Sequence, residues 1–153
     1  MKAVNRNIFM LALMAFAMVV MTGLPAAPAQ ASTPNYSVAV PGVEVIPIQL
    51  SGQYTSTTAA VARFQLPFKA RVIGVSASAR ASGGTSPTLT VDVQDDGTTI
   101  LSSPVSVTAG SVSEGTISAP AVADESVMTV DLAIGGTSPT WDDITVLVTV
   151  VRE

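Results

Sequence analysis

Apolar and polar side chains alternate in the segment 126–134, a period of two that places one set of side chains on a core face. The apolar set is Met128, Val130, Leu132 and Ile134. The next apolar segment, 144–151, is a nearly unbroken β-branched run. It is too short to span a bilayer and is typical of a strand covered on both faces. We expect the two segments to be the arms of a closing hairpin.

The hexapeptide Gly-Gly-Thr-Ser-Pro-Thr occurs twice, at residues 83–88 and 135–140. Glycine and proline interrupt regular strands, so each copy predicts a loop between the arms of one of two similar hairpins. The two loops are expected side by side at one end of the domain, as a contact surface. The candidate interaction residues are Gly83, Gly84, Thr85, Ser86, Pro87, Gly135, Gly136, Thr137, Ser138, Pro139 and Trp141.

Further short strands, separated by turn residues, are predicted between residue 36 and the closing hairpin. They cover residues 36–40, 43–50, 59–66, 70–80, 89–94, 98–101, 105–108 and 112–118. Pro47 lacks a backbone donor and is expected in an edge strand, and Asp95-Asp96-Gly97 is a hairpin turn of the Asp-Gly type. No convincing helix follows residue 31. The pattern predicts an all-β chain folded as one antiparallel β-sandwich of eight or nine strands, jelly-roll or immunoglobulin-like.

Residues 1–31 form a separate segment in front of the predicted domain 32–153. A basic start, an apolar stretch and a small-residue end give the pattern of a secretory signal cleaved between Ala31 and Ser32. The alternatives are an uncleaved apolar N-terminal helix, acting as a membrane anchor or an assembly arm, and a start codon upstream of the working one. Membrane contact is expected only through this segment, if it is uncleaved.

The composition excludes several kinds of chemistry. Histidine and cysteine are absent, which rules out a Ser-His-Asp triad, a cysteine nucleophile, imidazole or thiolate zinc sites and disulfides. The net charge is −4, and no Lys or Arg lies between Arg80 and Arg152 although nine acidic residues do. Such a surface repels phosphates, so no nucleic-acid partner is expected.

Carboxylates are the remaining acid–base groups, and two clusters stand out. They are Asp92 with Asp95 and Asp96, and Asp142 with Asp143. A glycosidase needs two carboxylates about five to ten ångströms apart, and the sequence positions no such pair. Calcium would need the fold to bring the clusters together, since no EF-hand spacing is present. We therefore expect no enzyme activity, no catalytic residue and no cofactor, with calcium as the alternative.

Trp141 is the sole tryptophan and sits beside two acids at a loop end. An exposed ring there would be a stacking platform for a sugar. The simpler interpretation is that the ring caps one end of the core, and we prefer it.

The last three-fifths of the chain, about Ala62 to Arg152, resembles small β-sandwich proteins of tailed bacteriophages and prophages. The resemblance lies in ARFQLPFKARVIGVSASAR, PTLTVDVQDDGTTILSSPVSVTAGSVSEGTI and ADESVMTVDLAIGGTSPTWDDITVLVTVVR. Those proteins are virion accessory components of the head-decoration or fibre type. The resemblance implies a non-catalytic protein that docks on a capsid or tail surface and self-associates, and it brings no functional residues with it.

The N-terminal segment departs from that pattern, because virion proteins assemble in the cytoplasm and need no export signal. Two functions therefore stay open. The first is a virion accessory protein located in the particle. The second is an exported cell-surface adhesin or carbohydrate-binding module, extracellular after signal cleavage.

Overall fold

The computed structural model describes residues 42–153, which are all-β. The strands are β1 (Val43–Tyr54), β2 (Thr58–Gln65), β3 (Ala70–Asp95), β4 (Thr98–Thr99), β5 (Val105–Ser106), β6 (Val112–Gly115), β7 (Ala121–Val122) and β8 (Val127–Arg152). The short β7 lies between the predicted strand 112–118 and the predicted closing hairpin, where no strand was expected. The predicted strand 36–40 and the predicted signal segment 1–31 lie outside the described residues. Within residues 42–153, no helix has the length and apolar character to cross a membrane.

Two strands of 26 residues each, β3 and β8, form the centre of the fold. They pair antiparallel from Ala70–Arg152 at one end to Asp95–Met128 at the other. The shorter strands flank this ribbon: β1 and β2 lie along β8, whereas β4, β5, β6 and β7 lie along β3. All pairings between the named strands are antiparallel and belong to one sheet. The all-β, antiparallel prediction is confirmed.

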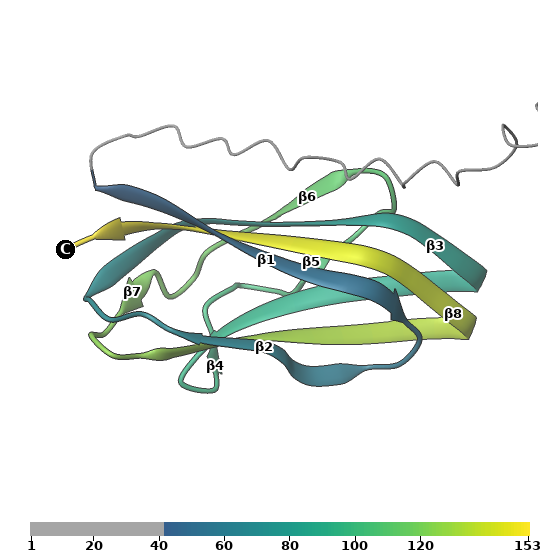
Figure 1. The fold of residues 1–153 in the computed structure, drawn as a ribbon, viewed down its shortest axis with the longest axis horizontal. Coiled ribbons are helices and arrows are strands. Elements are labelled where there is room, and N and C mark those ends of the chain that lie inside the picture. Colours follow the sequence, from purple (N-terminus) through teal and green to yellow (C-terminus); the bar gives the residue numbers. More distant parts are fainter. Residues whose placement is uncertain (1–41) are drawn as a thin grey trace, which may run out of the picture. The chain divides into compact units, whose positions relative to one another are not determined.

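The ribbon turns back on itself near its middle, where β3 and β8 bend together at one end of Figure 1. The bend lies at residues 83–88 and 135–140, the two copies of the hexapeptide. The prediction that these copies break the strands is wrong, because the two copies pair with each other and both strands continue through them. The predicted closing hairpin is also wrong, since each half of β8 pairs with β3 and not with the other half of β8.

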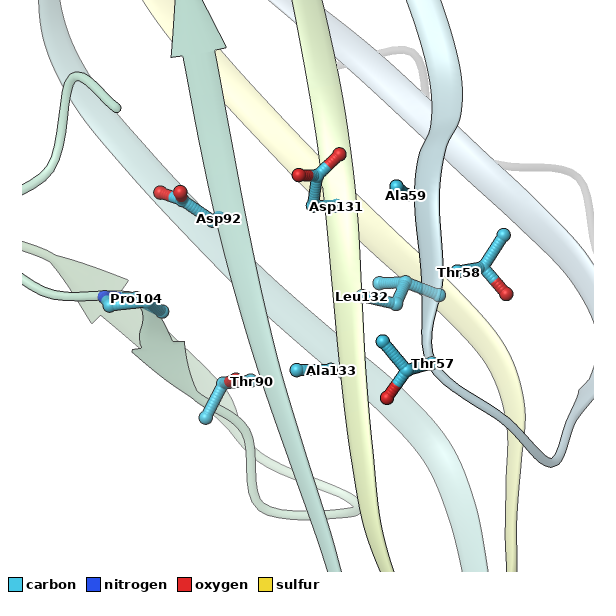
Figure 2. A pocket seen from close by; sticks show the side chains of 9 residues that line it. All are labelled: Thr57, Thr58, Ala59, Thr90, Asp92, Pro104, Asp131, Leu132 and Ala133. Carbon is cyan, nitrogen blue, oxygen red and sulfur yellow. The ribbon is translucent and has the colours of Figure 1, made fainter. Parts of the chain in front are cut away.

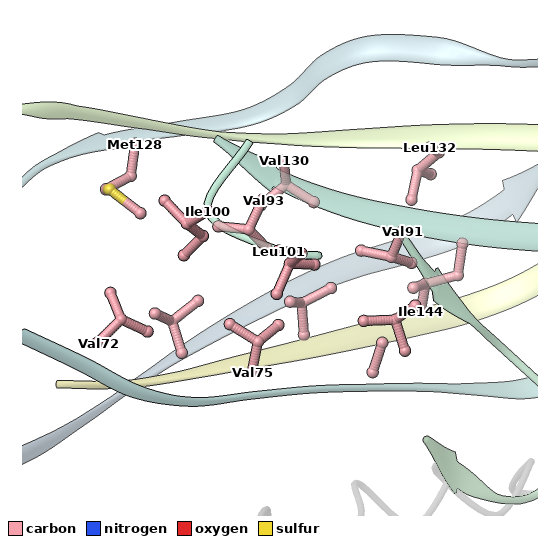
Figure 3. Close-up of a cluster of buried hydrophobic side chains, with 14 of the residues drawn as sticks. Val72, Val75, Val91, Val93, Ile100, Leu101, Met128, Val130, Leu132 and Ile144 are labelled. Carbon is pink, nitrogen blue, oxygen red and sulfur yellow. The ribbon is translucent and has the colours of Figure 1, made fainter. Parts of the chain in front are cut away.

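The core contains the inward side chains of both halves of the ribbon. Figure 3 shows Val72, Val75 and Ile144 on one side and Val91, Val93 and Val130 on the other. Ile100 and Leu101, from the connection after β4, complete it. Each fully buried Val or Leu contributes about 1.5–3 kcal/mol, whereas an exposed ion pair contributes about 0–1 kcal/mol. Burial of the alternating apolar set is therefore what stabilises the fold.

The outer strands β1 and β2 each contain a bulge that is held by an aspartate of β8. Gly52 in β1 donates its N–H to Asp143 at 2.9 Å, and Ala60 in β2 donates its N–H to Asp131 at 2.6 Å. Both donors sit at positive φ, +95° for Gly52 and +47° for Ala60, where the ladder is interrupted. The two carboxylates satisfy backbone groups that the bulges free from the sheet.

The Asp-Gly hairpin turn was predicted correctly. Asp95 pairs with Thr98 across a two-residue turn formed by Asp96 and Gly97, with φ values of +46° and +80°. Positive φ at both turn positions is the type I′ geometry that Asp-Gly favours. Pro47 lies in β1, which is at one end of the strand order, as expected for a residue without an N–H donor.

Candidate functional site

The two hexapeptides, predicted as interaction loops, meet in the bend of the ribbon. Their residues pair as Gly83–Thr140, Thr85–Thr137 and Thr88–Gly135. Two segments of identical sequence therefore pair antiparallel with each other. This pairing of residues 83–88 with 135–140, here called the crossing, has a local two-fold arrangement. The expectation that the copies lie side by side is confirmed, and the repeated sequence is explained by their equivalent places in the crossing.

Glycine is required at two equivalent positions of this crossing. Gly84 and Gly136 have φ values of +94° and +116°. A Cβ on Gly84 would lie 2.7 Å from the carbonyl oxygen of Thr137, and a Cβ on Gly136 would lie 2.7 Å from that of Ser86. Backbone oxygens cannot move aside as a flexible side chain can. The outer rim of the crossing is exposed and consists of small and hydroxyl residues: Gly84, Thr85, Ser86, Gly136, Thr137 and Ser138.

Trp141 is the one predicted interaction residue that does not reach the surface. It is 2 % exposed and lies between Ser82 of β3 and Tyr54 of β1 in the sheet register. Its indole N–H has no hydrogen-bond partner. The preferred interpretation as a core residue holds, and a sugar-stacking platform at this ring is wrong because no ligand can reach its face.

Asp142 and Asp143 lie next to the crossing and are held by neighbouring groups. Asp143 accepts the Gly52 N–H and binds Arg80, with 2.7 Å between Arg80 Nε and Asp143 Oδ2. The Gly52 N–H and then the Arg80 guanidinium hold the pKa of Asp143 below its usual range. The hydrogen bond and charge of Asp143 raise the pKa of Arg80. Asp142 accepts a hydrogen bond from Gln53 at 3.2 Å.

Asp95 and Asp96 lie at the opposite end of the ribbon. Both accept hydrogen bonds from the buried Ser126 hydroxyl, and Asp96 also accepts one from the Val127 N–H. Position 95 is seven residues beyond position 88 of the crossing, or about 23 Å along an extended strand. The fold therefore does not bring the two acidic clusters together. Among residues 42–153, no group of three or more carboxylates is placed to hold a metal ion.

Two carboxylates lie close together in a pocket on the outer side of β3 and β8. Asp92 of β3 and Asp131 of β8 are direct cross-strand partners and line an open pocket of about 230 Å³ (Figure 2). Asp92 accepts from the Thr99 hydroxyl at 2.6 Å, Asp131 accepts from the Ala60 N–H, and the Gln94 amide bridges them. These hydrogen bonds offset the repulsion of two like charges placed directly opposite each other. Both carboxylates thus have a role within the sheet.

An apolar surface lies on the outer side of β1, β3, β6 and β8, and the sequence interpretation did not single it out. Three exposed side chains define it: Val45, Ile73 and Val112, which are 50 %, 51 % and 70 % exposed. Leu147, half-buried, lies between them, paired with Pro47 and Ser76. The sequence feature that could have indicated this surface is the β-branched run 144–151 of β8, which predicted a strand covered on both faces. In the described residues one face of this run is buried and the other is half-exposed.

No family model matches the sequence, and no curated protein matches it. Solved structures with a similar fold include two from viruses. One is a chain of the cyanophage Pam1 capsid asymmetric unit, 22 % identical, with 85 % of this chain and all of that chain covered and a TM-score of 0.47. The other is a chain of the infectious bursal disease virus Gx strain, 15 % identical, with 72 % of this chain covered and a TM-score of 0.36. This chain spans 32 % of that second chain. Both come from viruses, and with TM-scores below 0.5 neither assigns a function to this chain.

Proposed function

We propose that this protein is a non-catalytic structural component of a virion, an accessory protein of the decoration or fibre type, built on a jelly-roll β-sandwich. The observation that carries the proposal is the sequence resemblance to phage β-sandwich proteins over about residues 62–152. The arrangement of the strands and the hydrogen bonds that the carboxylates accept within the protein support it.

The strand connections favour a jelly roll. One half of the folded ribbon has the order β1, β8, β3, β6, and the other half has the order β2, β8, β3, with β4 and β5 outside β3. Both halves share the two long strands and enclose one core. A double-stranded ribbon folded into two facing four-stranded layers is the jelly-roll arrangement. The immunoglobulin-like alternative has seven or nine separate strands without such a shared ribbon.

The charged groups support a structural role and not a catalytic one. Asp92, Asp131 and Asp143 each accept at least two hydrogen bonds from the protein itself. A general acid or a metal ligand must present its carboxylate to a substrate or an ion. We propose on this basis that the protein has no catalytic residue and no resident cofactor, calcium included.

An exported adhesin or carbohydrate-binding module is the second candidate. The signal-like pattern of residues 1–31 favours export. The burial of Trp141 removes the best sugar-stacking side chain from the surface, so this candidate would need the exposed rim of the crossing as its binding site.

Fractionation of the natively produced protein separates the two candidates. Cells, envelope, medium and particles are collected, and the intact mass of the chain is measured in each fraction. The virion proposal expects the chain in the particle fraction. A chain that begins at Ser32, is found in the medium or the envelope, and is absent from particles would refute it and support export.

A further inference from the structure

The apolar surface described above, here called the neutral face, has a composition unlike the opposite side of the molecule. Its members face outward from four neighbouring strands. They are Val43, Val45, Pro47 and Gln49 of β1, Thr145, Leu147, Thr149 and Val151 of β8, Arg71, Ile73, Gly74, Ser76, Ser78 and Arg80 of β3, and Val112 and Glu114 of β6. Between Arg71 and Arg80, the outward positions of the two central strands β3 and β8 carry no charged residue, and Glu114 of the outermost strand β6 lies beside Ser76.

Its few charges lie at the margins and cancel. Arg71 and Arg80 lie at the two ends of the face, Arg80 is paired with the adjacent Asp143, and Glu114 lies on β6. The opposite face presents Asp92 and Asp131 against one cation, Arg63. In a chain of net charge −4, two copies repel each other least through the neutral face.

The strand edges are poor alternatives for self-association. The free edge of β1 contains Pro47, which lacks an N–H, and β2 is distorted by the bulge at Ala60. On the other side of the sheet, β4, β5 and β7 have two residues each and β6 has four. Proline, bulges and short edge strands all oppose the addition of a further strand. Contact between copies is therefore expected through a face and not through an edge.

The neutral face has the area of a small specific interface. Three strands about 4.8 Å apart and seven residues long at about 3.3 Å per residue, with the four residues of β6 beside them, cover roughly 400 Å². Two such faces, with the relief of their side chains, bury roughly 1,000 Å² in total, which is at the lower end for specific contacts. We expect a dimer with an interface of this size to dissociate on dilution.

We infer that the neutral face is an interface between two copies of this chain, packed face to face around a two-fold axis near Ser76 and Leu147. Self-complementarity of one patch is what a two-fold dimer requires. The contact covers the outer face of the run 144–151, which the sequence predicts to be covered on both faces. The inference goes beyond the proposed virion role and does not depend on it, because it rests only on the surface of residues 42–153.

The test is sedimentation velocity of the purified, natively produced protein over a range of concentrations. We expect a monomer–dimer equilibrium, and we expect V45K and I73K each to raise the dimer dissociation constant at least tenfold. Both side chains are about half exposed, so the fold tolerates the change. The matched control is A133K, an exposed strand position on the opposite face, which should leave the equilibrium unchanged.

A second measurement uses the absence of cysteine from the chain. S76C, near the proposed axis, should form a disulfide-linked dimer under mild oxidation, whereas A133C should not. A monomer at every concentration overturns the inference. If S76C in that monomer also resists thiol reagents, residues 1–41 of the same chain cover the face. If it reacts when isolated but is protected in particles, another virion protein covers it. A dimer that V45K and I73K leave intact also refutes the neutral face as the interface.

Discussion

Replacing Gly84 by alanine tests the crossing of the two hexapeptides most sharply. Its φ of +94° lies in the left-handed region, which costs an L-residue about 1–2 kcal/mol. The added methyl would lie 2.7 Å from the Thr137 carbonyl oxygen and closer still to that of Ser138. Forcing a group into a packed site costs about 1–3 kcal/mol more. We therefore expect G84A to lower the free energy of unfolding by about 2–5 kcal/mol in total.

Two other glycines separate backbone strain from steric overlap. Gly97 has a φ of +80° with nothing within 4 Å of an added Cβ, so G97A should cost about 1–2 kcal/mol. Gly74 has no positive φ and only ordinary contacts at 3.7 Å, so G74A should change stability by less than about 1 kcal/mol. The expected order of destabilisation is G84A, then G97A, then G74A. G136A, at the equivalent position of the second copy, should resemble G84A.

Urea unfolding followed by Trp141 fluorescence measures these differences, because the single tryptophan is buried in the native chain next to the crossing. If G84A unfolds at the same urea concentration as G97A, the added methyl does not overlap the backbone of Thr137 and Ser138 in β8. That result would refute the continuous crossing of β3 and β8.

Four further outcomes follow from the structure. The pKa of Asp143 is lower in the folded chain than its usual 3.8, so its charged form stabilises the fold above that pH, and this contribution is lost as the pH falls through the folded pKa. The urea midpoint of D143N should lie below that of the wild type at pH 7, and the difference should shrink as the pH is lowered below 3.8. D131A removes the acceptor of the exposed Ala60 N–H, which water can then satisfy, and should cost about 0.5–1.5 kcal/mol in urea unfolding. Native Trp141 emission should be blue-shifted, resist iodide quenching and stay unchanged when sugars are added. P47V restores an N–H donor on β1 and should increase concentration-dependent aggregation measured by light scattering.

The sequence was sufficient where local chemistry decides the structure. The alternation in 126–134 and the run 144–151 predicted both arms of β8, and Asp96-Gly97 predicted the type I′ turn. It failed where pairing between distant segments decides. Gly135 and Gly136 have the composition of a loop, yet in the crossing they let two backbones approach closely inside continuous strands. A repeat indicates equivalent places in a fold, and only the three-dimensional register shows that the copies face each other.

The candidate site was predicted in part for the same reason. The hexapeptides were expected together and lie together. Trp141 was named with them because it is adjacent in sequence, but the bend directs its ring into the core. The neutral face was missed because Val45, Ile73 and Val112 come from three strands far apart in the chain, and only the assembled sheet brings them onto one surface.

The most direct test of the proposed function is the copy number of this protein per particle. Particles are purified through two successive density gradients with a high-salt wash between them, and this chain and the major shell protein are quantified by mass spectrometry. The virion proposal predicts a constant ratio of the two proteins across the peak and after the wash. A ratio that falls with each step, or a chain absent from the particles, would contradict it.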